Sequence, residues 1–393
     1  MNGRKQKMAS MTPQHQRSAI ILAAGYSRRM QRFKPLLTLG GQTVIERVVS
    51  LHRNIGVTDI RVVTGFRSEA IRSALTSLPV TVVHNPAHDT GMFSSVQAGV
   101  NSLPKDVTSF FVHPVDIPLV RPHTLVALMD AFDEHPSPVV YPVFDDTRGH
   151  PPLIQGVMKT AILSHSGNGG LRNLLRGFDS SARQVQVADE GVLLDLDTPG
   201  DFQRLSTRLE YSAILNEAES RILMKKVCML PEEVINHCRQ VAHVAEVLAS
   251  AVNGSGGAID SPLVYSAARV HDLARLERNH ATAGARLLEA MGFQAMAAIV
   301  AVHMDIDASA DSPLDEAQIV YLADKLVAGN TVVNLSQRFE AAEVKYGRDP
   351  KVLAKIRQRR RSAFCIQKKI EQASGNTIQI ILTKAGIIHG SQP

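Results

Sequence analysis

The chain has 393 residues, of which 44% are apolar and 20% charged, and its formal net charge is +6. This length is enough for two ordinary domains, each burying its own core without disulfides or metals as staples. The composition excludes a helical membrane protein, because no stretch approaches the roughly 18 consecutive apolar residues that span a bilayer. Nucleic-acid binding is not expected either, because the positive charge is modest, the chain has no Trp, and small phosphate-rich substrates explain the sign equally well.

The N-terminal residues 1–17 are basic and polar, and they lack the apolar stretch of a secretory signal. We expect them to form a disordered tail on a protein that stays in the cytoplasm. The three cysteines, Cys228, Cys238 and Cys365, form no CxxC pair, which suits a reducing compartment and argues against a thiolate zinc site. They are expected to be ordinary packing residues.

From Ala19 to about Arg208, short apolar runs alternate with amphipathic stretches, a pattern typical of a mostly parallel sheet covered by helices. Segments such as TVIERVVSLHRNI and HTLVALMDAFDEH have apolar residues three and four apart, as in helices. We therefore predict an α/β Rossmann-like domain. Its expected strands are 19–24, 59–64, 80–84, 109–115 and 138–143, with a late pair at 184–187 and 191–196.

After Pro199 the pattern becomes helical, and the one later stretch typical of a strand is TIQIIL near residue 377. A second, all-α domain is therefore expected, with the boundary near residues 208–226. The loop 252–262 is rich in Gly and Ser, but it lies inside the helical region and is interpreted as a helix connection.

The segment LAAGYSRRMQRFKPLL at 22–37 has the features of a phosphate-binding loop. A buried strand ends at Ala24, Gly25 is expected to let the backbone turn, and the free amides of a helix opening at 27–30 would attract anions. Arg28, Arg29 and Lys34 follow closely, so that fixed N–H donors and mobile cations can bind the same polyphosphate. The segment is neither a GxGxxG fingerprint nor a P-loop, which argues against a Rossmann dehydrogenase. From composition alone, a strand-turn-helix with solvated arginines is an equal alternative.

This segment resembles the opening motif of the MobA-like nucleotidyltransferases, which join a nucleoside monophosphate to a phosphorylated partner, and most closely the molybdenum-cofactor cytidylyltransferases among them. Five further ordered blocks extend the resemblance over about 18–207: NPAHDTGMFSSVQAG, HPVDIPLV, RGHPPL, GNGGLRNLL and DLDTPGD. The resemblance implies a nucleotide site formed by Leu22, Ala23, Ala24, Gly25, Ser27, Arg28, Arg29 and Lys34.

Specific roles also follow from that resemblance. Gly25, Arg29 and Lys34 would hold the triphosphate, Asp116 would bind Mg²⁺, and Asp197 would be a second ligand of that ion. Arg29, Lys34 and Asp116 are the expected catalytic residues of this half. Ala24 and Phe33 stand where the guanylyl branch usually has Gly and Asp, which favours CTP, whereas Gln31 and Asn168 depart from the common family pattern.

The position of Asp116 agrees with this role on physical grounds. It follows a predicted strand, and ligands of open α/β sheets bind at the carboxyl ends of the strands. An aspartate at a strand end is more often a cap or turn residue, but opposite a triphosphate loop its hard oxygen ligands suit Mg²⁺. The expected reaction is in-line attack by a substrate phosphate on the α-phosphorus of CTP, which needs no general base because the nucleophile is already ionised.

The helical half has a second set of polar residues, and they fall on apolar helix faces. His237 lies in line with valines, Asp324 shares a face with apolar residues, and His271 and Asp272 are adjacent, with His280 and His303 further on. A single inward histidine is usually a hydrogen-bonded core residue, but buried carboxylates need partners. Six such residues on consecutive helices are better explained by metal, and mixed imidazole and carboxylate ligation suits Fe, Mn, Zn or Co.

This set, with the strings HCRQVAHVAEVLA, ARVHDLA, NHATAGARLLEAMG and YLADKL, resembles the HD superfamily of metal-dependent phosphohydrolases over 227–335. By that resemblance His237, His271, Asp272 and Asp324 form the four-ligand core. His280 and His303 match the extra histidines of the binuclear branch, with Asp272 as the bridging ligand and catalytic residue. Arg275 stands where the family often has Lys, which keeps a cation for substrate phosphate.

The expected organisation is therefore a tail (1–17), a nucleotidyltransferase domain (18–207), a linker (208–226), an HD domain (227–335) and a C-terminal helical extension (336–393). We predict a bifunctional enzyme that uses CTP and molybdopterin as small-molecule substrates, with a molybdoenzyme apoprotein or its chaperone as a partner and no nucleic acid or membrane. One alternative keeps the first chemistry with another phosphorylated acceptor. Another makes the HD domain a nucleotide-binding regulatory module without turnover.

Overall fold

The computed structural model describes residues 16–388, which fold as two compact units that divide between Leu209 and Glu210. Of the predicted tail, residues 1–15 lie outside the described residues, whereas Arg17 is already the first residue of the first strand. Within 16–388, no helix has both the length and the apolar character needed to cross a membrane.

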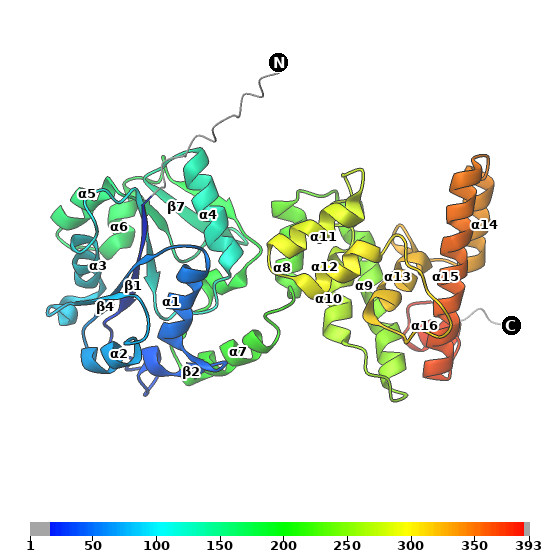
Figure 1. Cartoon of the computed structure of the whole chain (residues 1–393), viewed down its shortest axis with the longest axis horizontal. Coiled ribbons are helices and arrows are strands. Elements are labelled where there is room, and N and C mark those ends of the chain that lie inside the picture. The colour runs from blue at the N-terminus through cyan, green and yellow to red at the C-terminus, as the bar shows by residue number, and fades with distance from the viewer. Residues whose placement is uncertain (1–15, 389–393) are drawn as a thin grey trace, which may run out of the picture. The chain divides into compact units, whose positions relative to one another are not determined.

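The first unit contains a mixed sheet in the order β10-β7-β9-β6-β1-β4-β5, with β8 paired to β7 (Figure 1). All pairings are parallel except those of β8 and β9, so the predicted mostly parallel α/β fold is confirmed. Because β1 is buried on both faces, its sequence is a continuous apolar run rather than an alternating one. The strands are β1 (Arg17–Ala23), β4 (Asp59–Thr64), β5 (Thr81–His84), β6 (Ser109–Pro114), β7 (Val139–Phe144), β8 (Thr147–Arg148), β9 (Leu153–Gln155) and β10 (Arg183–Gln186).

Helices cover this sheet on both sides (Figure 1). On one side α3 packs against β1, β4, α5 and α6, and Ile20 and Val63 contribute to the buried cluster beneath it. On the other side α1 packs on β1 and α4 packs on β7, β9 and β10. The helices are α1 (Val44–Asn54), α2 (Ser68–Ala74), α3 (Met92–Asn101), α4 (Pro122–Glu134), α5 (Met158–Ser164), α6 (Gly170–Arg176) and α7 (Pro199–Glu210).

Short elements complete the first unit. The 3₁₀ turns are η1 (Lys34–Leu36), η2 (His88–Thr90) and η3 (Glu190–Leu193), and β2 (Thr38–Leu39) pairs with β3 (Gln42–Thr43). The strand predicted at 191–196 is wrong, because the carboxylate of Asp189 accepts the backbone N–H of Gly191 and closes η3 in its place. The antiparallel strand β9, which lies between β6 and β7, was not expected from the sequence.

The edge of the sheet that carries the carboxyl ends of β1 and β6 brings two predicted site segments together. These two strands are parallel neighbours, and Leu22 is in register with Pro114. The loop that contains Gly25 and the loop that contains Asp116 therefore leave the sheet side by side, where open α/β sheets bind ligands.

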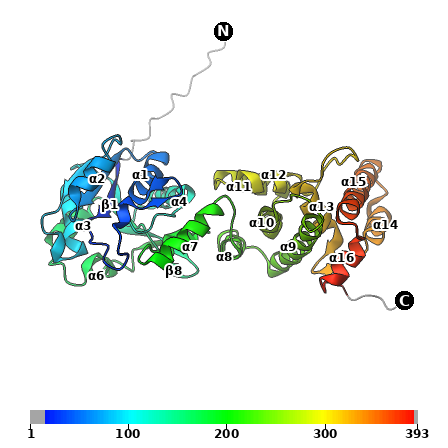
Figure 2. The ribbon, with the colours of Figure 1, turned by 90° about the horizontal axis from the view of Figure 1, so that it is seen from below.

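The second unit is built from helices, as predicted for an all-α domain. In two views related by 90°, α13 lies between α9 and α15, and it packs against both (Figures 1 and 2). Its helices are α8 (Glu217–Ile222), the π-helical turn η4 (Leu223–Val227), α9 (Glu232–Asn253), α10 (Ser261–Val270), α11 (His280–Ala290), α12 (Gln294–Val302), α13 (Glu316–Leu326), α14 (Leu335–Tyr346), α15 (Pro350–Ser374) and α16 (Ile378–Lys384). A two-residue hairpin, β11 (Val327–Ala328) and β12 (Thr331–Val332), follows α13.

The strand predicted from TIQIIL is also wrong, since these residues form α16. Thr377 caps the helix by accepting the backbone N–H of Ile380. Ile378, Ile381 and Leu382 are buried, and this spacing of three and four places them on one helix face. The apolar run was too short for periodicity alone to distinguish a strand from a buried helix.

Candidate active sites

The predicted phosphate loop of the first unit is a turn rather than the start of a helix. Ser27 and Gln31 adopt left-handed backbone conformations, with φ of 56° and 57°, which an α-helix excludes. The N–H groups of Met30 and Gln31 instead donate to the carbonyls of Ser27 and Arg28, closing two successive turns. Gly25 is not the left-handed residue of this loop, and a Cβ built on it would meet no atom within 4 Å. Nothing in the chain requires a glycine there, so the open space above it is available to a ligand.

Cations and carboxylates alternate beside this loop. The Nζ of Lys34 lies 2.6 Å from Oδ1 of Asp197 and 3.8 Å from Oδ2 of Asp116. Nη2 of Arg29 lies 2.8 Å from the other oxygen of Asp197. The structure thus brings four predicted site residues from three segments into one charged network, with Lys34 between the two carboxylates.

Backbone hydrogen bonds hold this network in register. The N–H of Leu196 donates to the carbonyl of Asp116 at 2.8 Å, which fixes the segment of Asp197 against the end of β6. On the loop side, the N–H of Lys34 donates to Oγ of Ser27 at 3.1 Å. The positions of the charged groups therefore follow from the backbone rather than from the ion pairs alone.

Asp195 is a third carboxylate of this site, and sequence reasoning missed it. Burial raises the pKa of Asp116 above its ordinary value, Lys34 opposes the shift, and the negative charges of Asp195 and Asp197 add to it. Burial likewise raises the pKa of Asp195, and Asp197 raises it further. Asp195 could have been recognised in the sequence from the alternation Asp-Leu-Asp, in which Leu196 is buried. Clustered carboxylates that repel one another are the hard-oxygen donor set that Mg²⁺ prefers.

A cavity of about 170 Å³ lies beside the charged network. Its lining includes most of the residues predicted for nucleotide binding, namely Leu22, Ala23, Ala24, Gly25, Ser27 and Lys34, together with the predicted metal ligand Asp116. Arg28 and Arg29 do not line it; the guanidinium of Arg28 lies 4.9 Å from the ring centre of Tyr26, and the side chain of Arg29 is 72% exposed. A second cavity of about 980 Å³ shares Leu22, Met92 and Pro114 with the first and is bordered by arginines 148, 172 and 176.

His113, on β6, belongs to the support of this site. Its Nδ1 is 2.9 Å from Nε2 of His52, and its Nε2 donates to the carbonyl of Ile117 at 2.9 Å. Both ring nitrogens are therefore used, and burial lowers the pKa of His113 to about 4. A neutral imidazole with both nitrogens bound indicates a structural role for His113.

In the second unit, separate elements present the six predicted ligands at one place. His237 lies on α9 and Asp324 on α13, while His271 and Asp272 follow the last residue of α10. His280 is the first residue of α11, and His303 follows the last residue of α12. All six are buried or nearly so, as their positions on apolar helix faces predict.

Asp272 lies at the centre of two groups of possible ligands. His237, His271 and Asp272 form one group and Asp272, His280 and His303 the other, each with its ligand atoms within 4.8 Å of one another. Oδ1 of Asp272 is 3.2 Å from Nε2 of His280 and 3.4 Å from Nε2 of His303. The carboxylate is thus shared, as a bridging ligand would be. Asp324 joins the first group, with Oδ1 3.2 Å from Nε2 of His237 and 3.7 Å from Nε2 of His271.

Backbone carbonyls orient three of the imidazoles. Nδ1 of His237 donates to the carbonyl of Gly329 at 2.8 Å, Nδ1 of His271 donates to Ala268 at 2.8 Å, and Nδ1 of His303 donates to Val300 at 2.7 Å. Because a carbonyl can only accept, each Nδ1 carries a proton, and Nε2 is the ring nitrogen that faces the carboxylates of Asp272 and Asp324. This is how proteins usually fix the tautomer of a metal-binding histidine.

The residues present fit a metal, because the chain leaves donor atoms at the centre without partners. Nε2 of His271, Nε2 of His303 and Oδ1 of Asp272 are buried and make no hydrogen bond. Burial lowers the pKa of His271 to about 4 in spite of the nearby carboxylates, so its ring stays neutral near pH 7. Burial works to raise the pKa of Asp272, but the imidazoles of His280 and His303 outweigh it and leave that pKa below its ordinary value. Neutral imidazoles and ionised carboxylates are the protonation states that metal ligation requires.

Two cations at this site were not predicted. The buried Lys325 donates to Oδ2 of Asp324 at 2.5 Å and to the carbonyl of His303 at 3.1 Å. Arg338, on α14, donates to the carbonyls of Asp324, Lys325 and Val327 at the end of α13. Both therefore hold Asp324 in place. Lys325 could have been recognised in the sequence from its place next to Asp324 in YLADKL. No sequence pattern indicates that Arg338 reaches across the hairpin.

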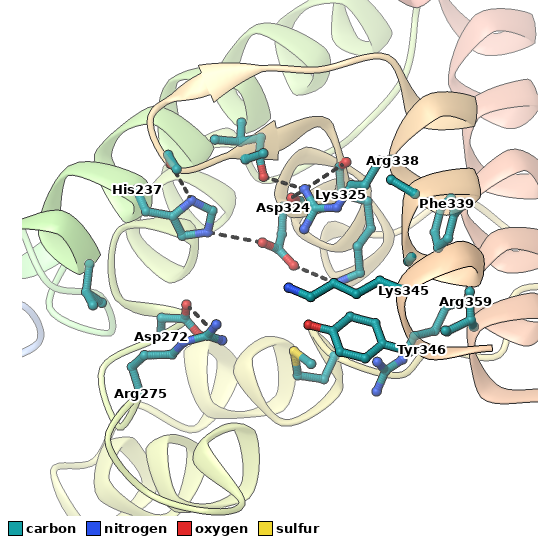
Figure 3. A pocket seen from close by; sticks show the side chains of 18 of the residues that line it. His237, Asp272, Arg275, Asp324, Lys325, Arg338, Phe339, Lys345, Tyr346 and Arg359 are labelled. Carbon is teal, nitrogen blue, oxygen red and sulfur yellow. Dashed lines mark hydrogen bonds and ion pairs between the residues drawn. The ribbon is translucent and has the colours of Figure 1, made fainter. Parts of the chain in front are cut away.

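A cavity of about 690 Å³ opens from this cluster toward α14 and α15 (Figure 3). Figure 3 shows His237, Asp272 and Asp324 at one end of it, with Arg275 beside Asp272. Nη1 of Arg275 is 3.5 Å from Oδ2 of Asp272, and its side chain is 49% exposed, so it can turn toward a ligand.

Comparison with known families matches the two units separately. Residues 19–187 match the MobA-like NTP transferase domain, and residues 234–329 match the HD domain. Both resemblances predicted from the sequence are thereby confirmed at the level of the domain.

Individual relatives match the first unit. The molybdenum cofactor cytidylyltransferase of Escherichia coli is 25% identical over 184 residues, which are 47% of this chain and 92% of that protein. The bifunctional protein GlmU of Rhodococcus opacus is 28% identical over 184 residues, 44% of this chain, and the match spans only about a third (35%) of its length. Among solved structures, a nucleotidyl transferase from Methanothermobacter thermautotroptrophicus is 24% identical, with 50% of this chain and 99% of that chain covered and a TM-score of 0.44. The chain therefore combines a MobA-like NTP transferase domain with an HD domain.

Proposed function

We propose that the protein is a bifunctional enzyme whose first unit transfers CMP from CTP to the phosphate of molybdopterin, with release of pyrophosphate. The observation that carries this proposal is the network of Arg29, Asp197, Lys34 and Asp116 at the carboxyl edge of the sheet. The similarity to the E. coli molybdenum cofactor cytidylyltransferase over 92% of its length supports the choice of acceptor. We expect the reaction to occur in the cytoplasm and to supply a molybdoenzyme apoprotein or its chaperone.

The charged network would have to reorganise when the nucleotide binds. Asp116 and Asp197 would hold Mg²⁺, with Asp195 close by, and the bound ion supplies positive charge that neutralises the triphosphate. Lys34 and Arg29 would then exchange Asp197 for phosphate oxygens, so that the carboxylates and cations separate onto different partners. The open position above Gly25 would admit the triphosphate close to the backbone.

The adjoining cavity of about 980 Å³ would receive the acceptor. A phosphate oxygen of the acceptor forms a bond to the α-phosphorus of CTP while the bond to the pyrophosphate oxygen breaks. Because the attacking phosphate is already ionised, the residues act by holding the two substrates in line and by offsetting charge, without a general base. Arg148 and Arg176, which border this cavity, can meet the acceptor phosphate.

Labelled CTP, GTP and ATP, each tested with molybdopterin, distinguish the nucleotides. We expect transfer from CTP, and loss of that transfer in Lys34→Ala but not in the exposed control Lys105→Ala. A strong preference for GTP would contradict the base assignment.

A second candidate acceptor is another phosphorylated compound. It is favoured by the similarity to GlmU proteins, whose identity to this chain is comparable to that of the cytidylyltransferase. Transfer of CMP to such an acceptor, with molybdopterin inactive in the same assay, would support it.

For the second unit we propose hydrolysis of a phosphoester or nucleotide. His237, His271, Asp272 and Asp324, with His280 and His303, would hold a divalent pair such as Fe, Mn, Zn or Co, which when bound activates water and withdraws charge from the phosphate. The chain's own contribution is a set of imidazoles already oriented by backbone carbonyls. Arg275 would bind the non-bridging oxygens of the substrate phosphate beside Asp272.

Metal-dependent release of phosphate by the purified chain tests this proposal, and Asp272→Ala should abolish it. Failure with a broad panel of phosphoesters and nucleotides, in protein that nevertheless binds nucleotide at this unit, would support the alternative of a regulatory module without turnover.

A further inference from the structure

The far wall of the cavity in the second unit comes from helices that the HD domain match does not include. That match ends at residue 329, whereas α14 and α15 begin at Leu335 and Pro350. Phe339, Tyr346 and Ile356 from these helices line the cavity opposite the histidine cluster. The histidine cluster thus faces a wall from the extension that carries aromatic and aliphatic side chains together with the cations Arg338, Lys345 and Arg359.

The size of the cavity argues against a substrate that consists of phosphate alone. Pockets that enclose small organic ligands measure roughly 300–1,000 Å³, and this cavity, at about 690 Å³, falls within that range. Inorganic phosphate or pyrophosphate would meet the cluster and leave the aromatic end to water. The wall from α14 and α15 therefore indicates an organic group attached to the phosphate.

The cations around the cavity differ in how firmly other groups of the protein already bind them. Arg359 forms a two-pronged ion pair with Asp305, at 2.6 and 2.9 Å, and Arg338 is bound to the carbonyls at the end of α13. Lys345 makes no ion pair within the described residues 16–388, and its Nζ lies 5.0 Å from the ring centre of Tyr346. Figure 3 shows Lys345 pointing into the cavity toward Asp324, while Arg275 enters from the opposite side. These two cations remain available to bind the oxygens of one phosphate.

Tyr346 offers a flat apolar surface at the other end. It is 53% exposed at the last turn of α14, whereas Phe339 on the same helix is 5% exposed and anchors that helix. An exposed aromatic ring that lines a cavity beside a lysine is suited to stack on a ring of a bound ligand.

We propose that Lys345 and Tyr346 form a specificity subsite for phosphate esters of compounds with a flat heteroaromatic ring. The phosphate lies between Arg275 and Lys345 at the histidine cluster, and the ring stacks on Tyr346. This inference rests on the phosphohydrolase function proposed above, in which a water oxygen bonds to phosphorus, the ester P–O bond breaks and the released alcohol takes the proton. Nucleotides and pterin phosphates share this ligand chemistry.

The test compares phosphates with and without a ring on the full chain. Calorimetric binding of CMP, neopterin phosphate and ribose 5-phosphate is measured on Mn²⁺-loaded protein carrying Lys34→Ala, which weakens binding to the first unit. Hydrogen exchange of α14 locates the ligand. We expect one of the ring-bearing phosphates to bind about tenfold more tightly than ribose 5-phosphate and to protect α14, since stacking of one base on one aromatic side chain gives an effect of this order.

Variants on the same helix separate the two roles. Tyr346→Ala should remove the advantage of the ring, and Tyr346→Phe should retain it. Lys345→Ala should weaken all three phosphates several-fold and to a similar extent. Val344→Ala, 87% exposed and outside the cavity lining, and Lys351→Ala, exposed on α15, are the matched controls and should change nothing.

The outcomes distinguish the inference from the function on which it rests. Tighter binding of CMP identifies a nucleotide, and tighter binding of neopterin phosphate identifies a pterin phosphate. Equal affinity for the three compounds, undetectable binding of all three, or a ring advantage that survives Tyr346→Ala overturns the subsite while phosphate release can still stand. Ring-dependent binding without phosphate release keeps the subsite and overturns the hydrolase.

Discussion

The two sites differ in whether their polar and charged groups are paired with one another before any ligand binds. In the transferase unit Asp116 and Asp197 both face Lys34, whose Nζ lies 2.6 Å from Asp197 and 3.8 Å from Asp116. In the HD unit the central atoms of His271, His303 and Asp272 are buried without a hydrogen bond. Unpaired buried polar atoms are costly, which supports the proposal that the HD site holds a resident ion. For the transferase site we propose instead that the charges stay paired until nucleotide and ion bind together.

The largest effect that we expect is a loss of metal affinity in the HD unit when Asp272 is replaced. Asp272 belongs to both possible ligand groups, so Asp272→Asn should weaken both metal positions. We expect the affinity of the HD unit for Mn²⁺ or Fe²⁺ to fall on the order of 100-fold or more, because losing a proposed metal ligand should exceed the roughly 10- to 100-fold loss that follows when a group hydrogen-bonded to a ligand is removed. Metal analysis by mass spectrometry after dialysis measures it, with the exposed Asp311→Asn as control. Full metal content in Asp272→Asn would show that Asp272 is not a shared ligand.

Sequence reasoning grouped the six candidate ligands of the HD unit because they lie on regular helices or within two residues of a helix end. The helical period places a residue on a face, and inward histidines and aspartates such as His237 and Asp324 then stand out among apolar neighbours. Lys325 and Arg338 were missed, since one acts through the neighbouring carboxylate and the other crosses a hairpin to reach backbone carbonyls. The contact of Arg338 depends on tertiary structure that no local pattern records, whereas Lys325 stands next to Asp324 in the sequence.

In the transferase unit the parallel strands were predictable, whereas the conformation of the loop after β1 was not. Parallel strands have long apolar runs, but left-handed conformations at Ser27 and Gln31 are set by the packing of the loop, so a helix start was wrongly expected there. The antiparallel β9 was missed because Leu153–Gln155 is too short to show a period. The order of strands, by contrast, was enough to bring Gly25 and Asp116 to one edge.

A second prediction compares the buried histidines of the two units. His113 uses both ring nitrogens, unlike His271, and its pKa is lowered by burial to about 4. An unfolded chain takes up this proton below about pH 6.5. The neutral ring therefore makes its full contribution to the free energy of unfolding above about pH 6.5. This contribution decreases as the pH falls toward 4, and the total loss is up to about 3 kcal/mol.

Hydrogen exchange of peptides that cover β6, corrected for intrinsic rates, measures this loss between pH 7 and 4.5. His113→Gln should reduce the pH dependence of the exchange. Part of this dependence should remain, because burial also lowers the pKa of His52. The exposed His84→Gln is the control and should behave as the wild type. A slope unchanged in His113→Gln would mean that other groups cause it.

A third prediction gives effects of opposite sign on two ligands in the transferase unit. Lys34→Ala removes a cation that both binds the triphosphate and competes with metal for Asp197. We expect the affinity for CTP to fall on the order of 30-fold, the range for a hydrogen bond to a charged group. Binding of Mn²⁺ without nucleotide should instead become several-fold tighter, because three carboxylates lose their neutralising partner. Mn²⁺ titration followed by electron paramagnetic resonance measures the second effect; weaker Mn²⁺ binding in Lys34→Ala would contradict the exchange of partners.

The smallest effect tests whether the C-terminal helices support the HD site or only border it. Arg338 on α14 donates to the carbonyls of Asp324, Lys325 and Val327, and thereby fixes the end of α13 that carries one predicted ligand. Arg338→Ala should lower metal affinity about tenfold, as the loss of a group that holds a metal ligand in place does, whereas Arg338→Lys should restore part of it by keeping one donor. The exposed Arg348→Ala is the matched control. Because the change lies outside the family match, which ends at residue 329, a tenfold loss would make the extension part of the metal site, and an unchanged affinity would limit it to the wall of the cavity.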